Sequence, residues 1–104
     1  MTSPRIETLR KLLAGRPDDP RIQYGLAVEL LKQGSHVEGV ALLSQYLEAG
    51  VDEGAGWGQL GEALWEMERP EEARQACLRG IEVAERHSHP TLAEDLREIL
   101  EGWE

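Results

Sequence analysis

The stretch that decides the fold is Trp57-Gly-Gln-Leu-Gly-Glu-Ala-Leu64. Its tryptophan and two leucines stand at steps of three and four, which is the spacing of one helical face. Small residues at Gly61 and, twelve positions later, at Ala73 let two consecutive helices cross closely, while the large side chains fill the space beside the crossing. The stretch therefore predicts a hairpin of two packed helices.

Apolar residues keep this helical spacing along the rest of the chain, and no alternating strand pattern appears. Proline or glycine punctuates the runs, and we expect turns near Gly34, Gly50, Arg69 and His87. Six helical segments joined by short loops imply antiparallel neighbours. The sequence therefore predicts an all-α fold, in which the apolar faces of six helices span residues 6–13, 21–33, 40–47, 57–65, 73–84 and 91–103. The third helix would start after Ser35, the fourth near residues 54–56, and the fifth with Pro70 in its first turn.

One of the predicted helix starts carries a specific capping signal. Ser35 is a natural N-cap, and Glu38 follows it at the spacing of a capping box. In a capping box, each of the two side chains accepts a hydrogen bond from the backbone N–H of the other residue. We therefore expect Ser35 and Glu38 to cap the helix that starts after Ser35.

The Trp57 stretch resembles the first half of a tetratricopeptide repeat, a helix–turn–helix unit that is about 34 residues long. The family's Trp, Leu, Gly and small second-helix residue fall on Trp57, Leu60, Gly61 and Ala73. One repeat length earlier in the chain, the same positions are Gln23, Leu26, Ala27 and Gly39. The resemblance covers about residues 5–85. It implies that helix packing within the repeats depends on Leu26, Ala27, Gly39, Trp57, Leu60, Gly61 and Ala73.

The resemblance also implies how the chain is organised. Residues 1–104 would form one domain in which antiparallel hairpins stack as a short right-handed solenoid. An N-terminal half-repeat (5–19) would precede two full repeats (20–53 and 54–87), and a capping helix (90–103) would follow them. The match has departures, because the family's second-helix aromatic is Leu43 in one copy and Cys77 in the other, and its terminal proline is replaced by Val51 and Glu85.

In this family, the first helix of each repeat lines a concave groove that binds extended or helical peptides. Tyr24 and Trp65 would be its aromatic anchors, although packing in the core is an equal alternative for Trp65. The family's carboxylate clamp is not expected, since only Lys32 agrees with it. Carried over by position, the groove would consist of Arg21, Tyr24, Val28, Leu31 and Lys32 from the first repeat, and of Gly58, Glu62, Trp65 and Glu66 from the second.

The charge and the cysteine content argue against several classes of partner and location. Among 104 residues there are 11 Lys+Arg and 20 Asp+Glu, a net charge of −9. This balance disfavours binding to nucleic acid or to an anionic membrane. A single cysteine, Cys77, forms no intramolecular disulfide, and no apolar run reaches the roughly 20 residues that span a bilayer. We expect a soluble cytoplasmic protein.

No nucleophile motif and no phosphate-binding loop is found, so we expect neither an enzyme nor a cofactor. His87 and His89, with Glu85 nearby, lack a third ligand at a characteristic spacing, so no metal site is expected. Cys77 has no neighbouring His or Lys in the predicted packing, and we expect an inert buried thiol.

These features predict a small adaptor or scaffold that binds a protein or peptide segment. One alternative is a self-associating homo-oligomer that stacks through its terminal helices, at Ile6, Leu9, Ile99 and Trp103. The other, less favoured, is a small metal-binding protein or enzyme built on the two histidines.

Overall fold

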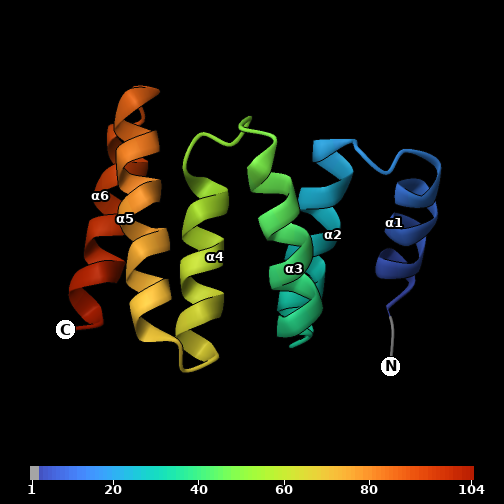
Figure 1. The fold of residues 1–104 in the computed structure, drawn as a ribbon, viewed down its shortest axis with the longest axis horizontal. Helices are drawn as coiled ribbons and strands as arrows, with labels where there is room; N and C mark the ends of the chain where they lie inside the picture. The colour runs from blue at the N-terminus through green and yellow to red at the C-terminus, as the bar shows by residue number, and fades with distance from the viewer. Residues whose placement is uncertain (1–2) are drawn as a thin grey trace. The chain divides into compact units, whose positions relative to one another are not determined.

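A computed structural model describes residues 3–104, and in this range the chain forms six α-helices and no β-strand (Figure 1). The expected all-α class is therefore confirmed. None of the helices in the described residues is both long enough and apolar enough to cross a membrane. The helices are α1 (Pro4–Gly15), α2 (Pro20–Lys32), α3 (His36–Glu48), α4 (Ala55–Glu66), α5 (Pro70–Arg86) and α6 (Pro90–Gly102).

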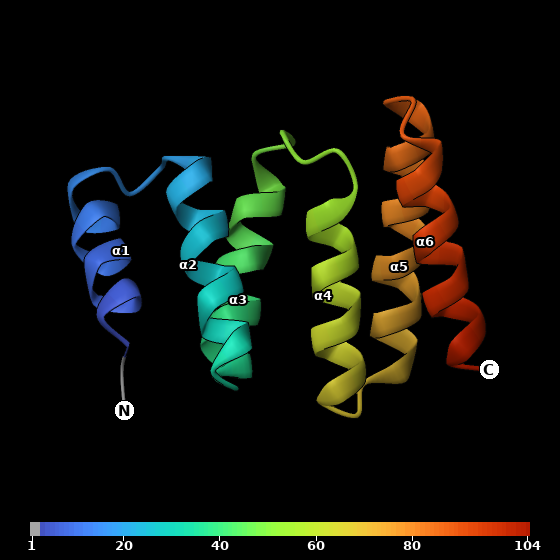
Figure 2. The ribbon, with the colours of Figure 1, turned by 180° about the vertical axis from the view of Figure 1, so that it is seen from behind.

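The helices divide into two compact units at the loop between α3 and α4. The first unit ends at Val51, and the second runs from Asp52 to Glu104. In the first unit α2 packs against both α1 and α3, and in the second α5 packs against both α4 and α6. Figures 1 and 2 show that consecutive helices within each unit run antiparallel. Each unit is therefore built from helices that are neighbours in the sequence.

Small residues bring the paired helices close together. A Cβ atom added at Gly61 on α4 would lie 3.2 Å from the Ala73 carbonyl oxygen on α5. A Cβ at Gly39 on α3 would lie 3.4 Å from the carbonyl oxygen of Ala27 on α2 and 2.7 Å from Cδ2 of Leu31. The two glycines and the two alanines are buried, whereas Leu31 is half-buried. The backbones therefore approach at these two crossings without room for a larger residue.

The turns after α2 and α4 use the same backbone hydrogen bond at equivalent positions of their hairpins. The N–H of Ser35 donates to the carbonyl of Leu30 at 2.9 Å, and the N–H of Arg69 donates to that of Leu64 at 3.0 Å. The residues before the two donors, Gly34 and Glu68, have φ angles of 89° and 61°. The turn after α5 is similar, because the N–H of His89 donates to the carbonyl of Ala84 and the residue before it, Ser88, has a φ of 61°. This is the Schellman arrangement that ends a helix with one left-handed residue.

The start of α4 is capped by a carboxylate. Asp52 is buried, and its side chain accepts hydrogen bonds from the N–H groups of Gly54 at 2.9 Å and Gly56 at 3.0 Å. The first N–H groups of a helix have no partner within the helix, and a carboxylate satisfies them well. Asp52 therefore stabilises the start of α4.

The expected capping box at Ser35 is wrong. Ser35 precedes α3, but its side chain makes no bond to the start of that helix and instead accepts from Nε2 of Gln33 at 2.7 Å. The Glu38 carboxylate binds the Arg10 guanidinium of α1, with Nη2 of Arg10 3.0 Å from Oε1. This contact holds the pKa of Glu38 below its usual range. A two-point bond to a guanidinium is stronger than a bond to a neutral N–H, so Glu38 turns towards α1.

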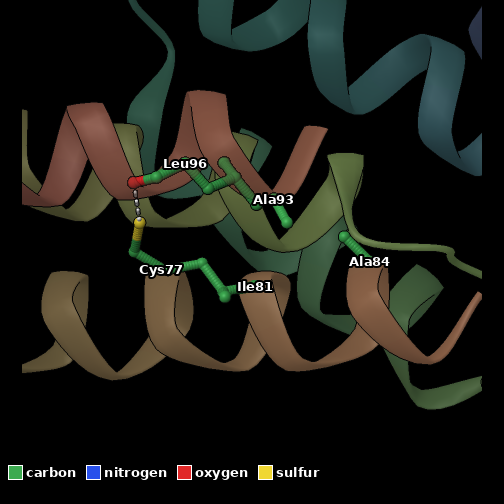
Figure 3. Close-up of a cluster of buried hydrophobic side chains, with 5 residues drawn as sticks. All are labelled: Cys77, Ile81, Ala84, Ala93 and Leu96. Atoms are coloured by element: carbon green, nitrogen blue, oxygen red, sulfur yellow. Dashed lines mark hydrogen bonds between the residues drawn. The ribbon is translucent and has the colours of Figure 1, made fainter. Parts of the chain in front are cut away.

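One cluster of buried apolar side chains in the second unit lies between α5 and α6 (Figure 3). Cys77, Ile81 and Ala84 of α5 face Ala93 and Leu96 of α6. The Cys77 thiol donates to the Leu96 carbonyl oxygen at 3.2 Å, the contact drawn as a dashed line in Figure 3. Burial, and to a lesser extent the charge of Glu62 nearby, raises the pKa of this thiol. The thiol is therefore held in its unreactive protonated form.

In the first unit, a cluster of buried aliphatic side chains joins α1 and α2. Ile6 of α1 is 1% exposed and packs with Leu26 and Leu30 of α2. Leu9, Leu13 and Leu42 cover this cluster from α1 and α3. The apolar face of α1 is thus used inside its own unit.

Candidate partner-binding surface

In the first unit, α2 carries five of the nine residues predicted to line a partner groove. The side chains of Arg21 and Lys32 are exposed, and those of Tyr24, Val28 and Leu31 are half-buried. Leu31 covers Gly39 at the α2–α3 crossing, so it contributes to packing within the unit. The exposed side chains of this surface therefore lie at the two ends of α2, with Arg21 at the first turn, one turn before the half-buried Tyr24, and Lys32 at the last.

Two tyrosines form a pair at this end of α2. The Tyr24 ring lies 4.9 Å from the ring of Tyr46 on α3, and the two planes are inclined by 43°. Both rings line an open depression of about 660 Å³, whose other sides are formed by Asp19, Pro20, Arg21 and Val51. Tyr46 is only 9% exposed, so the accessible apolar surface here comes from the half-buried Tyr24 and the exposed Val51, with Tyr46 supporting the Tyr24 ring from below.

Tyr46 and Val51 were not among the predicted groove residues. Tyr46 lies on the second helix of its hairpin, whereas the family's groove uses only the first helix, so the resemblance did not indicate it. The turn at Gly34 folds α3 back along α2, and this pairing brings Tyr46 to Tyr24. A search for aromatic residues on both helices of a hairpin would have found the pair.

Arg21 supplies the positive charge at the edge of the depression. Its side chain is 90% exposed, and Nε lies 3.9 Å from Oδ1 of Asp19. The same Asp19 oxygen accepts the backbone N–H of Arg21 at 3.0 Å, because Asp19 caps α2. Asp19 is therefore held by the helix start, while the Arg21 guanidinium extends into solvent beside the tyrosines.

In the second unit, Trp65 is in contact with the last helix. Its ring stacks on that of Trp103 at 4.9 Å with only 7° between the planes, and Cζ of Arg74 lies 5.9 Å from the ring centre. The Trp65 side chain is half-buried. Trp65 thus takes part in packing between α4 and the end of α6, and part of it remains accessible.

The other predicted groove residues of the second unit differ in exposure. Gly58 is buried, and a Cβ at this position would lie 2.6 Å from Cδ2 of Leu96 on α6. Glu62 and Glu66 are exposed on α4. The predicted groove would combine these residues of α4 with the residues of α2. Because such a groove would include residues of both units, it stays a prediction.

His87 and His89 face a carboxylate that the sequence did not indicate. Nε2 of His89 lies 2.5 Å from Oε1 of Glu53, and Nδ1 of His87 lies 3.9 Å from Oε2 of the same residue. The bond to His89 is the main cause that lowers the pKa of Glu53. Glu85 instead binds Arg97. Within residues 3–104, no three or more His, Cys, Asp or Glu side chains are grouped to hold a metal ion.

No protein-family model matches this chain, and no curated protein matches it. The resemblance to tetratricopeptide repeats therefore rests on the residues of this sequence. Its implications for binding stay predictions and are developed as proposals below.

Proposed function

We propose that this protein is a tetratricopeptide-like adaptor that binds a protein or peptide segment in the cytoplasm. The hairpins α2–α3 and α4–α5 would be its two repeats, stacked as a short right-handed solenoid, with α1 and α6 flanking them. Two observations support this assignment. The turns at Gly34 and Glu68 share their hydrogen bonding and lie one repeat length apart, and both hairpins cross at small buried residues.

The observation that carries the binding proposal is the depression around Tyr24 and Tyr46. Aromatic surfaces supply a large contact area at a low cost in conformational entropy, and they are enriched among residues that dominate binding energies. An apolar or aromatic side chain of the partner would lie against Tyr24 and the exposed Val51, with the buried Tyr46 behind the Tyr24 ring. The Arg21 guanidinium, at the edge, would contact an acidic side chain or a terminal carboxylate. The preferred ligand is therefore a segment that combines an apolar anchor with a nearby negative charge.

Selection from a library of random peptides of about 12 residues tests this proposal even though the natural partner is not identified. The enriched peptides are then titrated by calorimetry against the wild type, Tyr24→Ala, Arg21→Glu and a control, Leu78→Ala, on α5. We expect Tyr24→Ala to weaken binding by tenfold or more, which corresponds to at least about 1.4 kcal/mol. We expect Arg21→Glu to weaken it in a salt-dependent way.

Binding that is equal for the wild type and Tyr24→Ala would refute the proposal, and so would a selection that enriches no peptide. Loss of binding in Leu78→Ala alone would move the site to the outer face of α5. Circular dichroism of each variant verifies that the helices are retained.

The two alternative functions have less support. Stacking between copies through the terminal helices would use Ile6 and Trp103, yet Ile6 is buried in the first unit and Trp103 is stacked on Trp65. A metal protein would use His87 and His89, and both face a single carboxylate, Glu53.

A further inference from the structure

One carboxylate of the second unit contacts two histidines from a distant part of the sequence. Glu53 belongs to the loop that precedes α4, whereas His87 and His89 belong to the turn between α5 and α6. Nε2 of His89 lies 2.5 Å from one carboxylate oxygen of Glu53, and Nδ1 of His87 lies 3.9 Å from the other. We refer to these three side chains as the Glu53 cluster.

Backbone hydrogen bonds hold both sides of the Glu53 cluster in place. Ser88 separates the two histidines and has a φ of 61°, and the N–H of His89 donates to the carbonyl of Ala84 at 2.8 Å. On the other side, Asp52 directly precedes Glu53 and caps α4. The cluster therefore joins two points of the backbone that are each fixed by the end of a helix.

The strength of the contacts in the Glu53 cluster depends on the charge of the histidines. Histidine is the side chain whose ordinary charge change falls between about pH 5 and pH 8, and the sequence of the second unit contains two, His87 and His89. A protonated ring makes a charge-assisted hydrogen bond to a carboxylate, which is roughly twice as strong as a neutral one. When both rings are protonated, each oxygen of Glu53 faces a positive charge.

The helix ends act on the two histidines in opposite directions. His87 follows the last residue of α5, where the helix dipole favours a positive charge. His89 precedes the first residue of α6, where the dipole disfavours a positive charge. These contributions oppose each other when both rings are protonated, so the response of the pair to pH depends on Glu53.

Other charged side chains lie close to the Glu53 cluster. The end of α5 carries Glu85 and Arg86, and each of them is paired with an oppositely charged side chain of its own. Asp95 of α6 lines the same open depression, of about 560 Å³, as Glu53 and His89. Asp95 is therefore the carboxylate against which the role of Glu53 has to be compared.

From the contacts of one carboxylate with two histidines, we propose that the Glu53 cluster is a pH-sensitive latch of the second unit. Protonation of the histidines fastens the loop before α4 to the turn between α5 and α6, and loss of these protons loosens it. This inference goes beyond the proposed function, because it concerns the second unit alone and does not involve the tyrosine depression.

The latch works within a limited range of pH. Its upper limit is about pH 6.5, where histidine ordinarily loses its proton. At the lower limit, the bond to His89 holds the pKa of Glu53 below the ordinary value of 4.5. The contribution of the carboxylate is therefore present above pH 4.5 and disappears as the pH falls through the lowered value. The second unit should gain most from the latch between these two limits.

Urea denaturation of the full chain at about pH 5.5 and about pH 8 tests the inference. Tryptophan fluorescence reports on the second unit, because all three tryptophans belong to it. We expect the wild type to unfold at a higher urea concentration at the lower pH. Glu53→Gln and His89→Gln should each reduce this difference by at least half. His87→Gln should reduce it less, because its ring is farther from the carboxylate.

Asp95→Asn is the matched control, since it removes a carboxylate from the same depression and leaves the Glu53 cluster intact. It should keep the wild-type difference between the two pH values. A second measurement follows the carbon-13 shift of the Glu53 side-chain carboxyl group from about pH 5 to about pH 8. The shift should change in this range in the wild type, as the histidines change their charge, and should stay nearly constant in His89→Gln.

A wild type that unfolds at the same urea concentration at both pH values would overturn the inference. So would a difference that persists in Glu53→Gln, or a Glu53 carboxyl shift that does not respond to the histidines. If Asp95→Asn removed the difference as fully as Glu53→Gln does, the response would belong to the general negative charge of the unit, and the inference would again be wrong. None of these results would affect the peptide titrations on Tyr24→Ala, so the two proposals fail separately.

Discussion

Replacing Gly80 with alanine tests how closely the three helices of the second unit are packed. Gly80 is buried on α5, and an added Cβ would lie 3.0 Å from Cδ1 of Leu96 and 3.0 Å from Cβ of Trp57. It would also lie 3.2 Å from the carbonyl oxygen of Gly54. The end of the Leu96 side chain can rotate away, but the other two atoms belong to or adjoin the backbone. The new methyl group therefore displaces a helix or a loop.

The expected loss follows from two opposing contributions. Within a helix, alanine is more favourable than glycine by about 1 kcal/mol. Overpacking of a filled core costs about 1–3 kcal/mol, and contact on three sides places Gly80→Ala in the upper part of this range. We therefore expect the free energy of unfolding to fall by about 1–2 kcal/mol, with a melting temperature lower by about 4–8 °C per kcal/mol.

Urea denaturation with two spectroscopic signals assigns the change to the correct unit. Tryptophan fluorescence reports on the second unit, because Trp57, Trp65 and Trp103 all lie there. Far-ultraviolet circular dichroism reports on all helices. Gly80→Ala should shift the fluorescence transition to lower urea concentration.

Gly25→Ala is the matched control, since Gly25 lies within α2 of the first unit. A Cβ there would be 3.7 Å from Cδ2 of Leu9, an ordinary contact, so we expect a gain of about 0.5–1 kcal/mol. Equal stability of Gly80→Ala and the wild type, with the expected gain in Gly25→Ala, would refute the close packing around Gly80.

Three further changes test other parts of the structure. Asp52→Ala removes the carboxylate that caps α4 and should lower the free energy of unfolding of the second unit by about 1–2 kcal/mol, read from tryptophan fluorescence in urea; an unchanged transition would mean that the cap contributes nothing. Glu68→Gly relieves a left-handed backbone at φ 61° and should raise stability by about 0.5–1 kcal/mol in a thermal melt, and a loss would contradict the turn geometry. The Arg10 guanidinium lowers the folded-state pKa of Glu38, so this pair stabilises the fold above the ordinary pKa of 4.5, and the contribution disappears as the pH falls through the lowered value. Arg10→Gln should therefore flatten the pH dependence of the melting temperature below about pH 5. The corresponding loss in the free energy of unfolding should be no more than about 0.5 kcal/mol, because both side chains are half exposed. A profile of melting temperature against pH equal to that of the wild type would show that the pair is not formed.

The helices and most turns could be predicted because their signals are local. Apolar spacing gave the six helical segments, and glycine marked the turns at Gly34 and Gly50, where φ is positive. The turns at Glu68 and Ser88 adopt the same left-handed conformation without glycine, so only the proline two residues later indicates them. Local propensity therefore locates these turns but does not reveal their backbone conformation.

The contacts that could not be predicted join residues far apart in the sequence. Glu38 has a suitable local partner in Ser35, yet it binds Arg10, 28 residues away, because helix packing brings a guanidinium within reach. Glu53 meets His89 across 36 residues in the same way. For the candidate site, sequence reasoning identified Tyr24 but missed Tyr46, since their contact depends on the relative rotation of two helices.

The measurement that tests the binding proposal most directly is a map of amide chemical-shift changes, with the isotope-labelled protein titrated with a peptide selected on it. The proposal predicts that the largest changes cluster at Arg21, Tyr24, Tyr46 and Val51, and that the same peptide causes no such changes in Tyr24→Ala. Changes that centre on the outer face of α5 around Leu78, or that persist in Tyr24→Ala, would contradict it.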